Sequence, residues 1–237
     1  MKGQTVVVLG GSAGIGLETA RAARAEGADV VLTGRDPARL EAAAREVGAL
    51  SSAAFDATDP DRLARFFAEL PGPVDHVMLS GSGPYYAPLA EFDFAAARRD
   101  ADQHLWLPLH LGREAQGRVR PGGTLLFIGG TGGRTRGVGL ALIGALSAAL
   151  PAIAANLAVE LAPVRVNVIA PGFVDTALSA RLLGARLDAR REELRAKLPI
   201  GRVVGPADVA ALAIHLMTNT AVTGATYDVD GGQQLVV

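Results

Sequence analysis

Cysteine is absent from the 237 residues of this chain. A disulfide framework, a thiol nucleophile and a thiolate metal site are therefore excluded, and the four histidines do not stand at the spacings of metal ligands. We expect no bound metal and a reducing compartment. Because Met1 to Gln4 lead directly into an apolar run, with no room for a signal peptide, we expect a cytoplasmic protein.

An excess of charge of either sign is also absent, since 23 basic residues balance 24 acidic ones and the formal net charge is −1. Nucleic acids and anionic membranes attract proteins through clustered positive charge. We therefore expect neither as a partner. A small-molecule substrate is the partner that this composition favours.

Charge is missing altogether from residues 137–159. The stretch reaches the ~20 residues that a membrane span needs. However, it is mostly alanine, glycine and leucine, is interrupted by Ser147, Pro151 and Asn156, and has no Trp or Tyr at its ends. We interpret it as a helix that packs on a sheet with one face and on a neighbouring subunit with the other. The stretch thus predicts a homodimer or homotetramer and no membrane span.

A glycine-rich turn near the N-terminus is the strongest positive signal. The apolar run from Val6 to Leu9 is typical of a buried parallel strand, and Leu17 to Glu26 follow as a helix. Between them, the turn is predicted to bind the pyrophosphate of a dinucleotide at the helix N-terminus, where backbone N–H groups point outward. Its predicted cofactor-binding residues are Gly10, Ser12, Ala13, Gly14, Ile15 and Gly16.

The next predicted strand, Asp29 to Thr33, ends in Gly34-Arg35 followed by Asp36-Pro37. An acidic side chain at this strand end would bind the ribose of NAD, whereas an arginine can pair with the additional phosphate of NADP. We assign Asp36 as the N-cap of the following helix, with Pro37 as its first residue. Arg35 then favours NADP(H) over NAD(H), and a solvated surface arginine is the alternative.

Strands and helices alternate along the rest of the chain. This alternation predicts an α/β fold: a doubly wound, Rossmann-type parallel sheet of about seven strands with helices on both faces, in a single domain spanning residues 1–237. A long helix is expected over 92–119, broken near Pro108, and an arginine-rich lid over 177–200. The other predicted strands cover 53–55, 74–79, 124–128, 164–169 and 226–229, and Asp59 and Pro206 are predicted to open helices.

These segments, taken together, resemble the short-chain dehydrogenase/reductase family over essentially the whole chain. Gly10, Gly14 and Gly16 match its G-x3-G-x-G pattern, Asp56 matches the aspartate after its third strand, and residues 171–176 match its P-G-x-x-x-T segment. The resemblance implies that this last segment surrounds the nicotinamide half of the cofactor. For Asp56, an ordinary turn aspartate is the alternative to an adenine contact. The further cofactor-binding residues expected are Asp56, Ala57, Ser80, Gly81, Pro171, Gly172, Val174 and Thr176.

The residues that would carry the acid/base chemistry of this family are displaced. Gly130 stands where a serine polarises the substrate carbonyl, and Ile143 and Ser147 occupy the positions of the tyrosine and lysine of the family's Y-x-x-x-K pair. The helix asparagine of its proton relay aligns near His104. An isoleucine cannot exchange a proton, so the usual mechanism cannot run unchanged.

Three interpretations stay open, in this order. The chain is an NADP-dependent oxidoreductase for a small carbonyl or alcohol, with a substitute proton donor, because hydride transfer belongs to the cofactor. Alternatively, it is a catalytically inactive NADP(H)-binding subunit or sensor, or it performs non-redox chemistry on the same fold. The candidate proton donors are Tyr85, Tyr86, His104 and Thr131, whose alternative roles are aromatic packing, a polar helix face and a turn hydroxyl.

Overall fold

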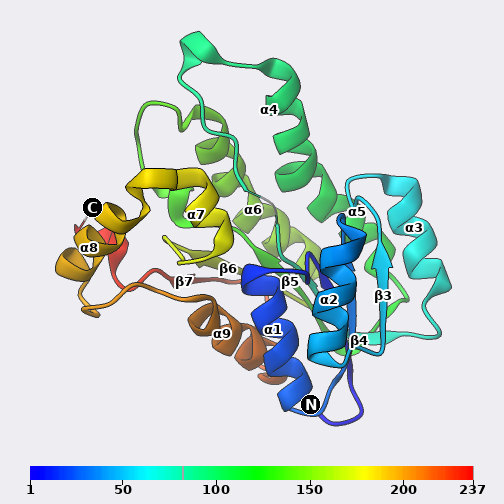
Figure 1. Ribbon diagram of the computed structural model, residues 1–237. Coiled ribbons are helices and arrows are strands. Elements are labelled where there is room, and N and C mark those ends of the chain that lie inside the picture. The colour runs from blue at the N-terminus through cyan, green and yellow to red at the C-terminus, as the bar shows by residue number, and fades with distance from the viewer. Residues whose placement is uncertain (82, 237) are drawn as a thin grey trace.

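Seven parallel strands form one sheet in the order β3-β2-β1-β4-β5-β6-β7. The computed structural model describes residues 1–81 and 83–236, and Figure 1 shows the strands running between layers of helices. Ser82 and Val237 lie outside the described residues. The strands are β1 (Thr5–Leu9), β2 (Asp29–Gly34), β3 (Ser51–Ala54), β4 (Val74–Leu79), β5 (Val119–Ile128), β6 (Arg165–Pro171) and β7 (Thr226–Val229).

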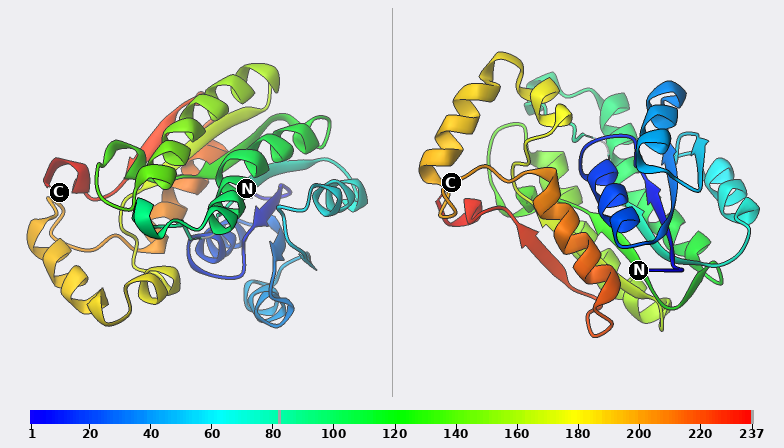
Figure 2. Two further views of the ribbon diagram at one scale, coloured as in Figure 1. Left: turned by 90° about the horizontal axis from the view of Figure 1, so that it is seen from above. Right: turned by 60° about the horizontal axis from the view of Figure 1, so that its bottom comes forward.

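Helices cover both faces of this sheet (Figure 2). One core cluster joins the sheet to α1 (Gly14–Ala25), α2 (Pro37–Val47) and α9 (Pro206–Thr218). The other joins it to α3 (Pro60–Glu69), α5 (Leu107–Ala115) and α6 (Ala141–Glu160). The remaining helices are α4 (Phe94–Ala101), α7 (Ala177–Leu183), α8 (Leu187–Lys197) and α10 (Gln233–Val236). The arrangement confirms the predicted doubly wound α/β fold.

Strand β1 lies at the centre of the sheet and pairs with β2 on one side and β4 on the other. Val6, Val7 and Val8 have no exposed surface, and Leu9 is 1% exposed. A run of apolar residues without polar alternation is what a strand covered on both faces requires. The glycine turn therefore starts from a rigid, fully enclosed strand end.

The helix N-termini predicted at Asp36 and Asp59 are confirmed, and each aspartate is the N-cap of its helix. The Asp36 side chain accepts the N–H of Arg39 at 3.1 Å, and Asp59 accepts the N–H groups of Asp61 and Arg62 at 3.0 Å each. Such contacts satisfy backbone donors that the first helical turn leaves open. The first helix, however, begins at Gly14 rather than Leu17, so it starts inside the glycine turn.

The long helix predicted over 92–119 is shorter at both ends, and its α-helical geometry is interrupted just ahead of Pro108, near the predicted place. Asp93 caps α4, which begins at Phe94, and α5 ends at Ala115. The irregularity is a π-helical turn, Asp102–Trp106, that joins α4 to α5 ahead of Pro108. Proline lacks an N–H and crowds the preceding turn, and the wider π turn accommodates both effects without breaking the helix.

Helix α6 begins at Ala141, four residues after the start of the uncharged stretch. Its buried residues are Ile143, Leu146, Leu150, Ala154 and Leu157, and the last three pack against the sheet in one core cluster. By length and composition alone, α6 could cross a membrane. In the structure, 22% of its most apolar 18-residue stretch is buried. The predicted packing on the sheet is confirmed, and most of the remaining apolar surface is uncovered within this chain.

Candidate nucleotide and substrate site

The glycine turn is so tight that side chains would not fit at two of its positions. Gly10 has φ +82°, and a Cβ atom there would lie 2.2 Å from the carbonyl oxygen of Ser80. A Cβ atom on Gly16 would lie 2.3 Å from the carbonyl oxygen of Gly10. These contacts bring the turns after β1 and β4 together at the carboxyl end of the sheet, where open α/β folds bind their ligands.

The N-terminus of α1 is open toward this turn. Ala13 is its N-cap residue and provides no side-chain hydrogen bond, and the first turn carries no acidic residue. The first N–H groups of a helix lack internal partners and mark the positive end of its dipole. The geometry therefore fits a phosphate group held by backbone N–H groups near Gly14 and Ile15.

The segment 171–176 lies across the crevice from the glycine turn. A Cβ atom added to Gly14, which has φ +56°, would lie 3.7 Å from Cγ2 of Thr176. Thr176 also caps α7, since its Oγ1 accepts the N–H of Ser179 at 3.3 Å. Pro171 ends β6 in register with Val229. The two segments that match the family pattern are thus brought within reach of one dinucleotide.

The end of β2 leaves Arg35 as the available charged group. Asp36 is occupied as a helix cap, while Arg35 is exposed and forms no ion pair within the described ranges. Ser12 lies beside the same strand end, because its Oγ is 3.1 Å from where a Cβ atom on Gly34 would be. A hydroxyl and a guanidinium at the same strand end are groups that can bind a phosphate ester.

Asp56 serves as a turn residue in this structure. Its Oδ1 atom accepts the backbone N–H of Thr58 at 3.0 Å and the Thr58 hydroxyl at 2.8 Å, and Ala57 lies between the two. This contact is the Asx-type turn expected of an aspartate after a strand. The adenine contact stays a prediction, as do the contacts of Ser80 and Gly81.

The predicted lid consists of α7 and α8, which project from one side of the molecule (Figure 2). Most of its charges pair within α8, as a solvated helix face would: Arg190 with Glu193, and Lys197 with Glu193. Arg191 differs, because its guanidinium holds the Asp175 carboxylate at 2.8 and 2.9 Å. Asp175 precedes Thr176, so the lid is tied directly to the segment 171–176.

Small or apolar side chains occupy the positions at which the resemblance places the family's catalytic groups. Ile143 is 6% exposed and lies near the start of α6. Gly130 and Ser147 line a cavity of about 220 Å³ between α6 and the ends of β5 to β7, which Arg134 and Thr226 also line. Among these three replacements, only the Ser147 hydroxyl carries a proton that could be exchanged.

Of the four candidate proton donors, Tyr85 takes part in a structural hydrogen bond and Thr131 is buried. The Tyr85 hydroxyl accepts the N–H of Asp93 at 2.7 Å, and its ring packs edge-on against Phe92 with centroids 5.4 Å apart. Thr131 is 7% exposed and begins the short 3-10 turn Thr131–Arg134. An aliphatic hydroxyl such as that of Thr131 is a poor proton donor without a partner that activates it.

His104 is held in a defined orientation by Asp100. Its Nδ1 atom lies 3.0 Å from both the backbone oxygen and the Oδ1 atom of Asp100. Burial disfavours the charged ring, but the hydrogen bond to Asp100 and its negative charge outweigh burial and raise the pKa of His104 above its ordinary value. Nε2 forms no hydrogen bond within residues 1–81 and 83–236, and the side chain is 19% exposed. The imidazole can therefore hold a proton near neutral pH and present it through Nε2.

Tyr86 lies in the electrostatic reach of the same carboxylate. Desolvation first, and then the charge of Asp100, raise the pKa of the Tyr86 hydroxyl, although the residue as a whole is 53% exposed. Asp100 is 4% exposed, and its Oδ2 atom has no protein partner among the described residues. Sequence reasoning missed Asp100, although its spacing of four residues before His104 on a predicted helix was a usable signal.

A second cavity, of about 560 Å³, lies between the loops that follow β4 and β5 and the start of α6. Its lining is mostly apolar and includes Ala87, Phe92, Leu140 and Ala145, with Arg136 as its charged member. Arg136 is fixed by hydrogen bonds to the carbonyl oxygens of Gly133 and Thr135 at 3.1 and 3.2 Å. Loops at the carboxyl end of the sheet thus enclose enough space for a small organic molecule.

Comparisons with known proteins agree with this geometry. A family model described as Enoyl-(Acyl carrier protein) reductase matches residues 10–234. Short-chain dehydrogenase/reductase ATR9 of Stachybotrys chlorohalonatus is 30% identical, covering 98% of this chain and 97% of the relative. The NADP-dependent (R)-specific alcohol dehydrogenase of Lentilactobacillus kefiri is also 30% identical, with 98% and 97% covered. A small-chain dehydrogenase solved in complex with NADPH is 27% identical, has a TM-score of 0.85, and is matched over 99% of this chain and 100% of its own.

Proposed function

This chain belongs to the short-chain dehydrogenase/reductase family, and from that premise we propose that it is an NADP(H)-dependent oxidoreductase acting on a small carbonyl or alcohol. The observation that carries the proposal is the glycine turn, where added Cβ atoms would meet backbone oxygens at 2.2 and 2.3 Å. A turn that excludes side chains beside an open helix N-terminus is the form that pyrophosphate binding requires.

Arg35 supports the preference for NADP(H). It follows Gly34, the last residue of β2, and has no ion-pair partner in the described part of the chain; the Ser12 hydroxyl approaches the same strand end at Gly34. The NADP-dependent relative and the neighbour solved with NADPH support the same choice. A 2′-phosphate would contact both side chains.

His104, oriented by Asp100, is the group we propose to hold and deliver the proton. When bound, the reduced nicotinamide supplies the hydride. The chain must then provide a proton for the substrate oxygen, and a histidine with a raised pKa suits that role near neutral pH. Asp100 fixes the ring and keeps Nδ1 as the donor toward the carboxylate, which leaves Nε2 for the substrate.

The test is NADPH titration followed by a screen of carbonyl substrates for loss of nicotinamide absorbance. His104→Gln should lower the rate of any accepted substrate by ~100-fold or more, and His110→Gln on α5 is the matched control. Asp100→Asn should lower the pKa of His104 and move the alkaline limb of the rate profile to lower pH. The assignment of His104 as the donor would be refuted if a substrate were reduced at the same rate and with the same pH profile in Asp100→Asn, His104→Gln and the unmodified chain.

A catalytically inactive NADP(H)-binding subunit or sensor is the second candidate function. Buried Ile143, and the cavity that Gly130 and Ser147 leave, favour it, because these positions carry no general acid. This function predicts tight NADPH binding with no turnover of any carbonyl in the screen. Restoring the family residues together, as Gly130→Ser, Ile143→Tyr and Ser147→Lys, should then create turnover without tightening the binding of the adenine half.

We also propose that the chain forms a homodimer or homotetramer through α6 and resides in the cytoplasm. The mostly uncovered apolar surface of α6 supports assembly, since monomers rarely expose patches of that kind. Light scattering at micromolar concentration should give at least twice the mass of one chain. A stable monomer, or partition of the untagged protein into membranes, would contradict this assembly.

A further inference from the structure

The C-terminal turn α10 is bonded to the segment that would surround the nicotinamide. The Gln233 side-chain oxygen accepts the backbone N–H of Phe173 at 2.9 Å. A Cβ atom on Gly172 would lie only 2.8 Å from that same oxygen and 2.8 Å from Cβ of Asp230. Gln233 and Asp230 therefore pack directly against the backbone of the segment 171–176 and fix its path.

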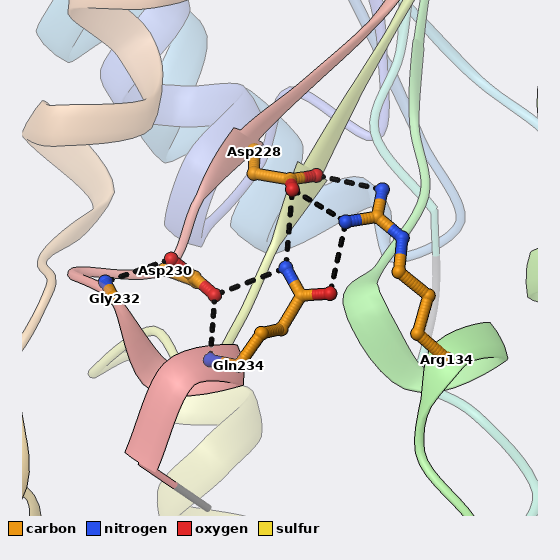
Figure 3. A network of polar contacts seen from close by, with 5 residues as sticks. All are labelled: Arg134, Asp228, Asp230, Gly232 and Gln234. Atoms are coloured by element: carbon orange, nitrogen blue, oxygen red, sulfur yellow. Dashed lines mark hydrogen bonds and ion pairs between the residues drawn. The ribbon is translucent and has the colours of Figure 1, made fainter.

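The next residue, Gln234, is bonded to the loop that follows β5 (Figure 3). Its Oε1 atom accepts a hydrogen bond from Arg134 at 2.9 Å, and its Nε2 atom donates to Asp228 and Asp230 at 3.1 Å each. Arg134 also holds the Asp228 carboxylate with both terminal nitrogens. Every polar atom of the Gln234 amide is thus engaged, in a network that links residues about a hundred positions apart in sequence.

Hydrogen bonds in this network favour the charged form of the Asp230 carboxyl. Burial would raise the pKa of Asp230, but N–H donations from Gln234 and Gly232 outweigh it and lower that pKa. The hydrogen bond to Asp228 raises the pKa of Arg134. Charge-assisted bonds of this kind hold their geometry better than neutral ones.

α10 therefore bridges two segments that flank one space. Arg134 ends the turn that starts just after Gly130, and a Cβ atom on Gly130 would lie 3.7 Å from the carbonyl oxygen of Pro171. In the family, a lysine anchors the nicotinamide ribose, but Ser147 is too short to reach in that way. The orientation of the nicotinamide half must then come from the backbone of these two segments.

We infer that Gln233 and Gln234 are positioning residues for the nicotinamide half of the cofactor, and that they act by bracing the segment 171–176 against the loop after β5. The inference rests on the proposed NADP(H) binding. It assigns no contact between either glutamine and the cofactor. It predicts instead that losing these glutamine hydrogen bonds weakens binding of the nicotinamide half of the dinucleotide and leaves binding of the adenine half unchanged.

The experiment compares the affinities of the full chain for NADPH and for 2′-phospho-ADP-ribose, which lacks the nicotinamide. Gln233→Leu should weaken NADPH binding by fivefold or more, since one hydrogen bond that orders the segment is lost. The affinity for 2′-phospho-ADP-ribose should stay within twofold of the unmodified chain. Gln233→Glu keeps an acceptor for the Phe173 N–H and should restore NADPH binding, and Gln234→Leu should act in the same direction as Gln233→Leu.

Gln116→Leu, at an exposed glutamine that ends α5, is the control and should change neither affinity. Thermal unfolding of each variant checks that the fold is kept. Equal weakening of both ligands, or unchanged NADPH affinity in Gln233→Leu, would overturn the inference. If the unmodified chain binds neither ligand, the proposed function itself fails. That result differs from an unmodified chain that binds NADPH and a Gln233→Leu variant that binds it equally well.

Discussion

Lowering the pH should destabilise this protein through one buried histidine, and His76→Leu should remove that effect. His76 lies in β4, is 2% exposed, and neither ring nitrogen has a hydrogen-bond partner among the described residues. Burial, with a smaller contribution from the charge of Arg165, lowers the pKa of His76 from 6.5 to about 4, although Asp75 opposes the shift. The folded state therefore favours the neutral form of the His76 ring.

The sign and size of the effect follow from linkage between protonation and folding. Above pH 6.5 the ring is neutral in both states and stability is unaffected. Between pH 6.5 and 4, His76 is protonated in the unfolded chain and neutral in the folded chain. The free energy of unfolding therefore falls by about 1.4 kcal/mol for each unit by which the pH is lowered. The total loss is about 3 kcal/mol below pH 4, and about 2 kcal/mol is already lost at pH 5.

Urea unfolding at pH 7.5 and pH 5.0 measures this loss. Carboxylates and the other histidines titrate alike in both proteins, so the fall in stability of the unmodified chain minus that of His76→Leu isolates His76 and should be about 2 kcal/mol. His215→Leu, at an exposed histidine, should lose stability in parallel with the unmodified chain. A difference below about 0.5 kcal/mol for His76→Leu would mean that the ring is charged or hydrated in the folded state.

Three further predictions concern the cofactor and the core. NADPH should bind at least tenfold more tightly than NADH, about 1.4 kcal/mol, and Arg35→Asp should erase or reverse that ratio; equal dissociation constants in the unmodified chain would refute the assignment. Gly16→Ala should weaken NADPH binding by more than tenfold because the added Cβ would meet the Gly10 carbonyl oxygen. Gly72→Ala is the control: no atom lies within 4 Å of the added Cβ, so the dissociation constant for NADPH should stay the same. Arg165→Met should lower the free energy of unfolding by about 3 kcal/mol because it strips carbonyl oxygens at the end of α9 of their donor, and the same change at exposed Arg120 should cost under about 0.5 kcal/mol.

The fold was predictable from the sequence because its signals are local. The β-branched run of β1, the glycine turn and the caps Asp36 and Asp59 each act through neighbours within a few residues, and each lies where it was expected. The place of the interruption near Pro108 was predictable but its form, a π-helical turn, was not, because a proline shows only where a hydrogen bond is lost. It does not show how the preceding turn absorbs the loss.

The contacts that shape the site were not predictable, because they join distant segments. Arg134 and Asp228 lie 94 residues apart, and nothing in either local sequence marks them as partners. Nothing in the sequence indicates that the Tyr85 hydroxyl oxygen accepts the Asp93 N–H and is held in place by it. Arg165 stands in an alternating strand pattern that suggests one solvated face, yet it is 6% exposed and bonded to the end of α9.

Strand β1 is the first part of the sheet to be synthesised, and in the finished fold it is paired along both edges. β2 follows it closely, but β4 begins only at Val74. At ribosomal rates of about 5–20 residues per second, several seconds pass in which one edge of a fully apolar strand stays open. Open apolar edges pair readily with other chains. Until the fourth strand emerges, the newly made N-terminal segment therefore exposes an apolar strand edge at which pairing with another chain is favoured.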